Sequence, residues 1–311
     1  MTPAPRDHSV RELLKEGIAR LRAADVPSYT LAAELLLLSV VGRDRTWIYA
    51  HPEETIAAAA VEKYEALLER RAAGEPTQYL TGKQEFWGLE FAVTPDVLIP
   101  RPETEHLIEV ALDRLAVREI RAGRPPRLTG EDISLVDVGT GSGCIAVALA
   151  KELPSAIVYA TDVSSVALKI AQRNAAQLGF ASRIHFVESN LFSAFLPRAT
   201  GHSPLGFDLV ISNPPYVSRR DASSLSVEVR AHEPEVALYG GEEGFEFYAE
   251  LVSQARRFVK PGGLLVLELG YDSLPAVQPL LDATTWTNIG ITNDLAGIPR
   301  VLSAERLPLN S

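Results

Sequence analysis

The chain carries L-V-D-V-G-T-G-S-G at residues 135–143 and continues with C-I-A-V-A-L-A at residues 144–150. The first four residues predict an apolar strand, and the last seven predict a buried helix. The glycines between them let the backbone turn tightly and bring a ligand close to main-chain N–H groups. This stretch therefore predicts an α/β domain with a nucleotide-type site at its first strand-to-helix turn.

An acidic residue follows the next predicted strand. That strand covers residues 158–161, and Asp162 comes directly after it. Its carboxylate is placed to accept hydrogen bonds from both hydroxyls of a ribose. The pattern does not choose the nucleotide, because Gly141, Gly143 and Ala146 also satisfy the dinucleotide pattern G-x-G-x-x-A. These residues alone do not exclude a nicotinamide cofactor.

A second polar turn, N-P-P-Y at residues 213–216, follows the strand predicted over residues 207–212. Ligands of such sheets bind at the edge where the strands end. Two consecutive prolines make a rigid turn whose carbonyls are free to face a ligand. The carbonyl of Pro214 and the side-chain oxygen of Asn213 therefore provide two neighbouring acceptors.

Two such acceptors suit the transfer of a methyl group to a planar amide or aromatic amine. The nitrogen of such a group attacks a methyl sulfonium poorly, because its lone pair is delocalised. Acceptors on both N–H bonds would orient the lone pair and stabilise the positive charge that develops on nitrogen. Tyr216 can stack on the planar group. Both motifs together favour an S-adenosylmethionine-dependent N-methyltransferase.

The N-terminal region has a helical pattern over residues 9–74. We expect a first helix capped by Ser9 and Glu12, a second over residues 28–42 and a third over residues 55–73. Short β-type runs follow at residues 85–87 and 90–93, on either side of a Gly88-Leu89 turn, and predict a hairpin.

After a helix predicted over residues 103–122, strands and helices alternate to near the end of the chain. This alternation predicts a doubly wound, mostly parallel seven-stranded sheet of the class I methyltransferase kind. The predicted strands cover residues 135–138, 158–161, 184–187, 207–212, 264–269, 287–291 and 300–305.

Further motifs carry a resemblance over nearly the whole chain. They are Q-Y-L-T-G (78–82), E-F-W-G-L-E-F (85–91), V-L-I-P-R-P-E-T-E (97–105), E-P-E-V-A-L-Y-G-G-E-E-G (233–244) and G-I-P-R-V (297–301). With N-P-P-Y, they resemble the bacterial protein-(glutamine-N5) methyltransferases that modify class-one peptide chain release factors. The hairpin and the I-P-R-P-E-T-E run are the family-specific parts.

The resemblance implies methyl transfer from S-adenosylmethionine to the glutamine of a Gly-Gly-Gln motif, with S-adenosylhomocysteine as the other product. It implies a helical substrate-docking domain (1–75), a hairpin linker (76–102) and a methyltransferase domain (103–311). The implied cofactor site consists of Gly139, Thr140, Gly141, Ser142, Gly143, Asp162, Asn190, Leu191 and Asn213. The implied glutamine pocket consists of Asn213, Pro214, Pro215 and Tyr216, with catalytic roles for Asn213, Pro214 and Tyr216.

Two positions depart from the family pattern. Phe245 follows Gly244 where a Leu is usual, which is a conservative change. Asn190 stands where the family often has Asp before the adenine pocket, and its oxygen can still accept from an adenine amino group. For Arg101, Glu103 and Glu105, two roles stay open, namely lining the substrate cleft or capping the helix that follows.

Composition weighs against the rival functions. The formal net charge of −10 argues against a protein that binds duplex nucleic acid mainly through its phosphates, although an adenine or guanine amino-methyltransferase remains the chief alternative. A nicotinamide oxidoreductase would leave N-P-P-Y without a task, and a non-enzymatic binding module would bind cofactor without turnover. The single cysteine, Cys144, gives no disulfide framework and no zinc cluster, so a cytoplasmic protein without a metal is expected. The longest apolar stretch, residues 35–41, is too short to span a bilayer, so no membrane segment is expected.

Overall fold

The structure, a computed structural model, describes residues 8–121, 133–196 and 206–308. The chain forms two compact units, Met1–Lys83 with Ser226–His232, and Gln84–Leu225 with Glu233–Ser311. We call them the helical unit and the catalytic unit. Among the described residues, no helix has the length and apolar character needed to cross a membrane.

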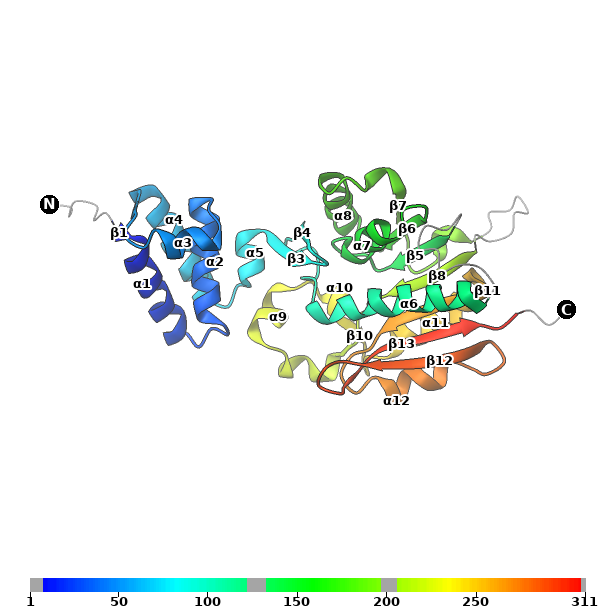
Figure 1. Ribbon diagram of the computed structural model, residues 1–311. Helices are drawn as coiled ribbons and strands as arrows, with labels where there is room; N and C mark the ends of the chain where they lie inside the picture. The colour runs from blue at the N-terminus through cyan, green and yellow to red at the C-terminus, as the bar shows by residue number, and fades with distance from the viewer. Residues whose placement is uncertain (1–7, 122–132, 197–205, 309–311) are drawn as a thin grey trace. The chain divides into compact units, whose positions relative to one another are not determined.

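The helical unit packs short helices around its own apolar core (Figure 1, blue to cyan, with α9 in yellow). Its helices are α1 (Val10–Ala23), α2 (Tyr29–Val41), α3 (Arg45–Ala50), α4 (Ala58–Ala72), α5 (Thr77–Thr81) and α9 (Val227–His232). The capping box predicted for the first helix is confirmed, since Glu12 N donates to Ser9 Oγ and Ser9 N donates to the Glu12 carboxylate. The second helix ends as predicted at Gly42, whose φ is 65°.

The third predicted helix is wrong at its beginning. Residues Thr55–Ile56 form strand β2, which pairs with β1 (His8–Ser9), so helix α4 starts at Ala58. The tertiary pairing overrides the local helical pattern. Helix α3 was not predicted, and its first turn is capped by Asp44, whose side chain accepts from Trp47 N at 2.8 Å.

Helix α9 joins the helical unit although it follows the N-P-P-Y turn in sequence. The guanidinium of Arg71, which is buried in α4, pairs with the carboxylate of Glu228. Val227 lies against Gly74, where an added Cβ would come within 3.1 Å of it. Ser226–His232 are thus held within the helical unit.

The hairpin is formed by β3 (Lys83–Phe86) and β4 (Leu89–Ala92). Its turn lies at Trp87-Gly88 instead of the predicted Gly88-Leu89, and the φ angles of these two residues are 56° and 67°. Positive φ at both central residues is the geometry that matches the twist of a tight hairpin. Phe86 and Phe91 are buried in the core of the catalytic unit, so the hairpin is part of that core.

The predicted seven-stranded sheet is confirmed. Its strands are β5 (Ser134–Val138), β6 (Ile157–Asp162), β7 (Ile184–Glu188), β8 (Phe207–Ser212), β11 (Val259–Glu268), β12 (Trp286–Asn293) and β13 (Pro299–Arg306). They lie in the order β12-β13-β11-β8-β5-β6-β7, with β13 antiparallel to both neighbours and the other pairs parallel. Strand β11 begins at Val259 instead of Leu264, because Val259 pairs with Phe207 before an irregular Pro-Gly-Gly segment shifts the register.

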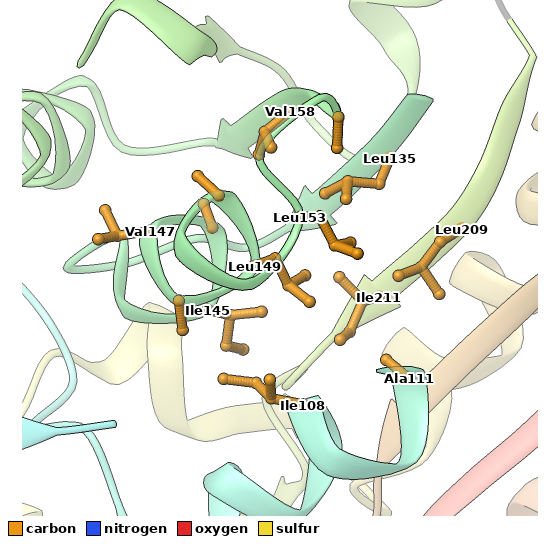
Figure 2. Close-up of a cluster of buried hydrophobic side chains, with 14 of the residues drawn as sticks. Ile108, Ala111, Leu135, Ile145, Val147, Leu149, Leu153, Val158, Leu209 and Ile211 are labelled. Atoms are coloured by element: carbon orange, nitrogen blue, oxygen red, sulfur yellow. The ribbon is translucent and has the colours of Figure 1, made fainter. Parts of the chain in front are cut away.

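Successive residues of the strands enter two cores, one on each face of the sheet. In β8, Leu209 and Ile211 join one core, whereas Val210 joins the other. The first core is covered by α6 (Glu105–Arg121), α7 (Cys144–Glu152) and α8 (Ser165–Gln177), and Figure 2 shows Ile145 and Leu149 of α7 turned toward the strands. Helix α11 (Glu246–Phe258) covers the second face.

Short elements complete the catalytic unit. The helix predicted from residue 103 begins at Glu105, because Pro102–Thr104 form a 3₁₀ turn. The others are β9 (Val217–Ser218), β10 (Tyr239–Gly241), α10 (Glu235–Leu238), α12 (Leu274–Val277) and 3₁₀ turns at Ala181–Arg183, Ser193–Phe195, Arg219–Ser224 and Gln278–Leu280.

Candidate functional site

The two predicted motifs meet at the carboxyl edge of the sheet, where the strand order reverses between β5 and β8. Asp137 lies opposite Ile211 in this parallel pair, so the same register sets Gly139 beside Asn213. Val138 lies opposite Thr161 of β6, which sets Gly139 beside Asp162. This reversal point is where open α/β sheets bind ligands.

The glycine turn is held to β6 by backbone hydrogen bonds. Gly139 N and Thr140 N both donate to the carbonyl of Thr161, at 2.9 and 2.8 Å. Gly139 and Gly141 have φ angles of 77° and 53°, and a Cβ added to either would meet nothing within 4 Å. The turn therefore leaves open space directly above the backbone, as a bound nucleotide requires.

Gly143 serves packing instead. Its φ is 83°, and an added Cβ would lie 2.9 Å from the Cβ of Ala171 in α8. Gly143 is the N-cap of α7, so a side chain there would push α7 away from α8.

Asp162 braces the glycine turn with its carboxylate. Oδ2 accepts from Gly141 N and Oδ1 accepts from Ser164 N, each at 2.9 Å. Burial raises the pKa of Asp162, and these two hydrogen bonds act in the opposite direction. Each carboxylate oxygen can accept more than one hydrogen bond, so both can still accept from hydroxyl groups of a ligand.

Two adjoining hollows open at this edge, and both are lined by Leu98, Gly139, Gly141 and Asn213. The first hollow also contains four predicted site residues: Asp162, Asn190, Leu191 and Pro215. The second hollow contains two more: Thr140 and Ser142. Among the residues described, three of the predicted ones line neither hollow: Gly143, Pro214 and Tyr216.

The turn after β7 carries the predicted adenine-side residues. Leu191 is buried and has a φ of 50°, which is uncommon for a residue with a side chain. Ser189 stabilises this turn, because its hydroxyl donates to the Leu191 carbonyl at 2.8 Å and accepts from Ala194 N at 3.1 Å. Sequence reasoning missed Ser189.

The Asn213 side chain is held by Thr104. Asn213 Nδ2 donates to Thr104 Oγ1 at 3.1 Å, so the side-chain oxygen of Asn213 faces away from Thr104. Burial raises the pKa of Tyr216 to about 12, so its hydroxyl stays protonated in mildly alkaline solution as well. The Tyr216 ring lies against Gly270, where an added Cβ would be 2.6 Å from Tyr216 Cδ2.

The run at residues 97–105 serves two purposes. Arg101 lines the second hollow and pairs with the buried carboxylate of Glu233. Glu105 accepts from Trp87 N at 2.7 Å and so fixes the turn of the hairpin, while Glu103 is exposed. Two roles were left open for these residues, lining the substrate cleft and capping the helix that follows. Arg101 fits the first role, whereas Glu105 is the first residue of α6 and also holds the hairpin.

A buried asparagine joins the hairpin to the glycine turn. Asn174 of α8 accepts from Ala92 N at 2.8 Å and donates to the Ala92 carbonyl at 3.0 Å. It also donates to the Ser142 carbonyl at 2.8 Å. Sequence reasoning missed Asn174, Thr104 and Leu98; only the quoted V-L-I-P-R-P-E-T-E run pointed to the last two.

Known proteins resemble the chain over nearly its whole length. Residues 12–82 match the family described as PrmC N-terminal domain, and residues 127–232 match the one described as methyltransferase small domain. The release factor glutamine methyltransferase of Koribacter versatilis is 42% identical over 294 residues, which are 94% of this chain and 97% of that protein. That of Burkholderia pseudomallei is 43% identical over 292 residues, covering 93% and 95%.

Among solved structures, the hMettl16 catalytic domain in complex with MAT2A 3'UTR hairpin 6 has a TM-score of 0.53. It is 17% identical and covers 78% of this chain and 84% of that chain. At this identity the similarity concerns the fold alone.

Proposed function

Because the chain belongs to the release factor glutamine methyltransferase family, we propose that Asn213 and Pro214 present the glutamine of a release factor to S-adenosylmethionine. The enzyme transfers the methyl group to the side-chain amide nitrogen of that glutamine. The observation that carries the proposal is the Asn213 side-chain oxygen, which is turned away from Thr104 at an edge shared with the glycine turn.

The residues at the glycine turn fit the cofactor. Gly139 and Gly141 leave open space above the backbone, and the Asp162 carboxylate stands beside them. We assign the ribose hydroxyls to Asp162 and the adenine edge to Asn190 and Leu191, which line the same hollow. When bound, S-adenosylmethionine supplies an electrophilic methyl group on a sulfonium.

The target amide is oriented by acceptors at the N-P-P-Y turn. The Asn213 oxygen and the Pro214 carbonyl accept its two N–H bonds, so the nitrogen lone pair faces the methyl group. The same acceptors stabilise the positive charge that develops on nitrogen. Pro215 lines the first hollow. We assign stacking on the planar amide to Tyr216, which follows it directly but lines neither hollow. No strong base is needed before attack.

A nucleic-acid amino group is the second candidate acceptor, since N-P-P-Y suits any planar N–H donor of this kind. The net charge of −10 disfavours it. A class-one release factor is therefore the proposed partner, and the cytoplasm, where translation ends, is the proposed location. Label transfer to a purified release factor, compared with transfer to RNA and DNA, tests this choice; label on nucleic acid alone would contradict it.

Replacing Asp162 with alanine should weaken the binding of S-adenosylmethionine and S-adenosylhomocysteine. Loss of a charged acceptor costs about 1–3 kcal/mol, so calorimetry should show a dissociation constant roughly 5- to 150-fold higher. Asp113→Ala is a matched control, because Asp113 is exposed on α6. Unchanged affinity in Asp162→Ala would refute the assignment, as would binding of NADH in place of S-adenosylmethionine.

We assign docking of the release factor to the helical domain, residues 1–75. Support comes from the match of residues 12–82 to the PrmC N-terminal domain. A truncated chain tests the docking role, and the core of the catalytic unit determines the residue at which that chain must begin. A chain starting at Pro102 would lose Phe86 and Phe91 from the catalytic core, whereas one starting at Gln84 keeps both.

The chain starting at Gln84 keeps the glycine turn and N-P-P-Y, but it removes Arg71 and Gly74, which contact α9. Where it binds cofactor as the whole protein does, it should methylate a short Gly-Gly-Gln peptide at a similar rate. On an intact release factor its kcat/KM should fall at least about tenfold, equivalent to losing ~1.4 kcal/mol of docking energy. Cofactor affinity and melting temperature are the controls for folding. Undiminished activity on the intact release factor would contradict the docking role.

A further inference from the structure

Glu268 is a buried carboxyl at the same edge of the sheet. Leu267 of β11 lies opposite Ser212 of β8, so the register sets Glu268 beside Asn213. The residue is 2% exposed. Among the described residues, Glu268 Oε2 has no hydrogen-bond partner. Burying a carboxyl with so few partners costs stability, and a local task would account for its presence.

Thr104 connects this carboxyl to Asn213. The Thr104 side chain is also 2% exposed, and its hydroxyl accepts from Asn213 Nδ2 at 3.1 Å. The same hydroxyl is close enough to the Glu268 side chain to lower the pKa of that carboxyl, and the register sets Glu268 beside Asn213. A hydroxyl has one proton, and an ionised carboxylate only accepts. The proton of Thr104 therefore goes to Glu268, and its oxygen is left to accept from Asn213.

The charges around Glu268 affect its ionisation. Burial raises the pKa of Glu268 to about 7, whereas the Thr104 hydrogen bond and the positive charges of Arg300 and Arg101 lower it. The negative charge of Glu103 acts in the same direction as burial. Arg300 is itself paired with Asp294 at 3.0 Å. Burial outweighs these contacts, so the pKa of Glu268 stays raised, but Thr104 and the arginines keep the ionised form accessible near neutral pH. That ionised form fixes the direction of the Thr104 proton.

We propose that Glu268 is a positioning residue, which acts through Thr104 to hold the Asn213 amide with its nitrogen toward Thr104 and its oxygen toward the target glutamine. The inference rests on the proposed function of Asn213. The two ends of an asparagine amide have nearly the same shape, so packing alone does not choose between them. A flipped Asn213 would set its own N–H groups against those of the target and lose the acceptor.

The proposal predicts how substitutions at Thr104 behave. Thr104→Val keeps the volume but loses the hydroxyl, and kcat should fall about 10- to 100-fold because the acceptor is no longer oriented. Thr104→Ser keeps the hydroxyl and should restore most of kcat. Calorimetry with S-adenosylhomocysteine should give affinities within about twofold of the unchanged protein in both variants, because a factor of two is under 0.5 kcal/mol.

Substitution of Glu268 separates positioning from a structural role. Glu268→Met removes the carboxyl and fills the space, so the melting temperature should stay equal or rise, while kcat falls about tenfold or more. A structural role would lower the melting temperature. The double variant Thr104→Val, Glu268→Met should be no slower than Thr104→Val alone, because both changes remove one chain of contacts.

Three results would overturn the proposal: a Thr104→Val or Glu268→Met variant with kcat within twofold of the unchanged protein, no rescue by Thr104→Ser, or multiplying losses in the double variant. The Asn213→Ala variant separates this failure from failure of the proposed function. If Asn213→Ala is slow and Thr104→Val is not, only the positioning role fails. If neither is slow, the assignment of Asn213 fails as well.

Discussion

Replacing Asn213 with alanine should lower kcat by about 10²- to 10³-fold, the range for deleting one group that stabilises a transition state. The variant loses the acceptor beside the Pro214 carbonyl, so the target amide is held by one contact instead of two. The affinity for S-adenosylhomocysteine should change much less, because Asp162 and the glycine turn are intact. Single-turnover kinetics at saturating cofactor measure the chemical step directly.

Asn213→Asp is the companion variant. It keeps an acceptor toward the target, but it adds a charge and loses the NH₂ group that donates to Thr104. Its kcat should fall between those of the unchanged protein and Asn213→Ala. A folded, cofactor-saturated Asn213→Ala variant that methylates at close to the unchanged rate would end the assignment.

The Gly240→Ala variant should give the second largest loss, with kcat lowered about 10²-fold. A Cβ at Gly240 would lie 2.4 Å from the Pro215 carbonyl oxygen and 2.6 Å from that of Gly244. Both are backbone atoms, so the N-P-P-Y turn itself must move, and a misplacement of about 1 Å can cost this much rate. Overpacking should also destabilise the fold by roughly 1–3 kcal/mol.

Gly206→Ala is the matched control for this variant. Its added Cβ would meet Lys260 Cγ at 3.0 Å, in a flexible side chain that can move aside. Thermal melting and kcat, measured on both variants, give the comparison. If Gly240→Ala melted and turned over like Gly206→Ala, the close packing of Gly240 under the Pro215 carbonyl would have no part in placing the turn.

Strand and helix positions in the catalytic unit followed well from sequence because the sheet is buried on both faces. Residues 207–212 were predicted as a strand and form β8 with the same bounds. Parallel strands also end at a common edge, which explains why Asp162 and Asn213 flank Gly139 as expected. At Thr55–Ile56 the pairing with β1 determines the conformation, so the local helical pattern gave a wrong prediction there.

The contacts that orient Asn213 could not be predicted from the sequence. Thr104 and Asn213 are separated by 109 positions, and Glu268 reaches them only through the register between β8 and β11. That register is shifted after Val259, in a Pro-Gly-Gly segment that resembles a turn. Similarly, the pairing of Arg71 with Glu228 spans 157 positions and leaves no periodic signal.

Mass mapping of the modified residue tests the central claim most directly. A purified class-one release factor is incubated with the enzyme and isotopically labelled S-adenosylmethionine, then digested and sequenced by mass spectrometry. The account predicts one added methyl group, on the side-chain nitrogen of the glutamine in the Gly-Gly-Gln motif, and none when Asn213→Ala is used for the same short reaction. Methylation at any other residue of the release factor, or none with the unchanged enzyme, would contradict it.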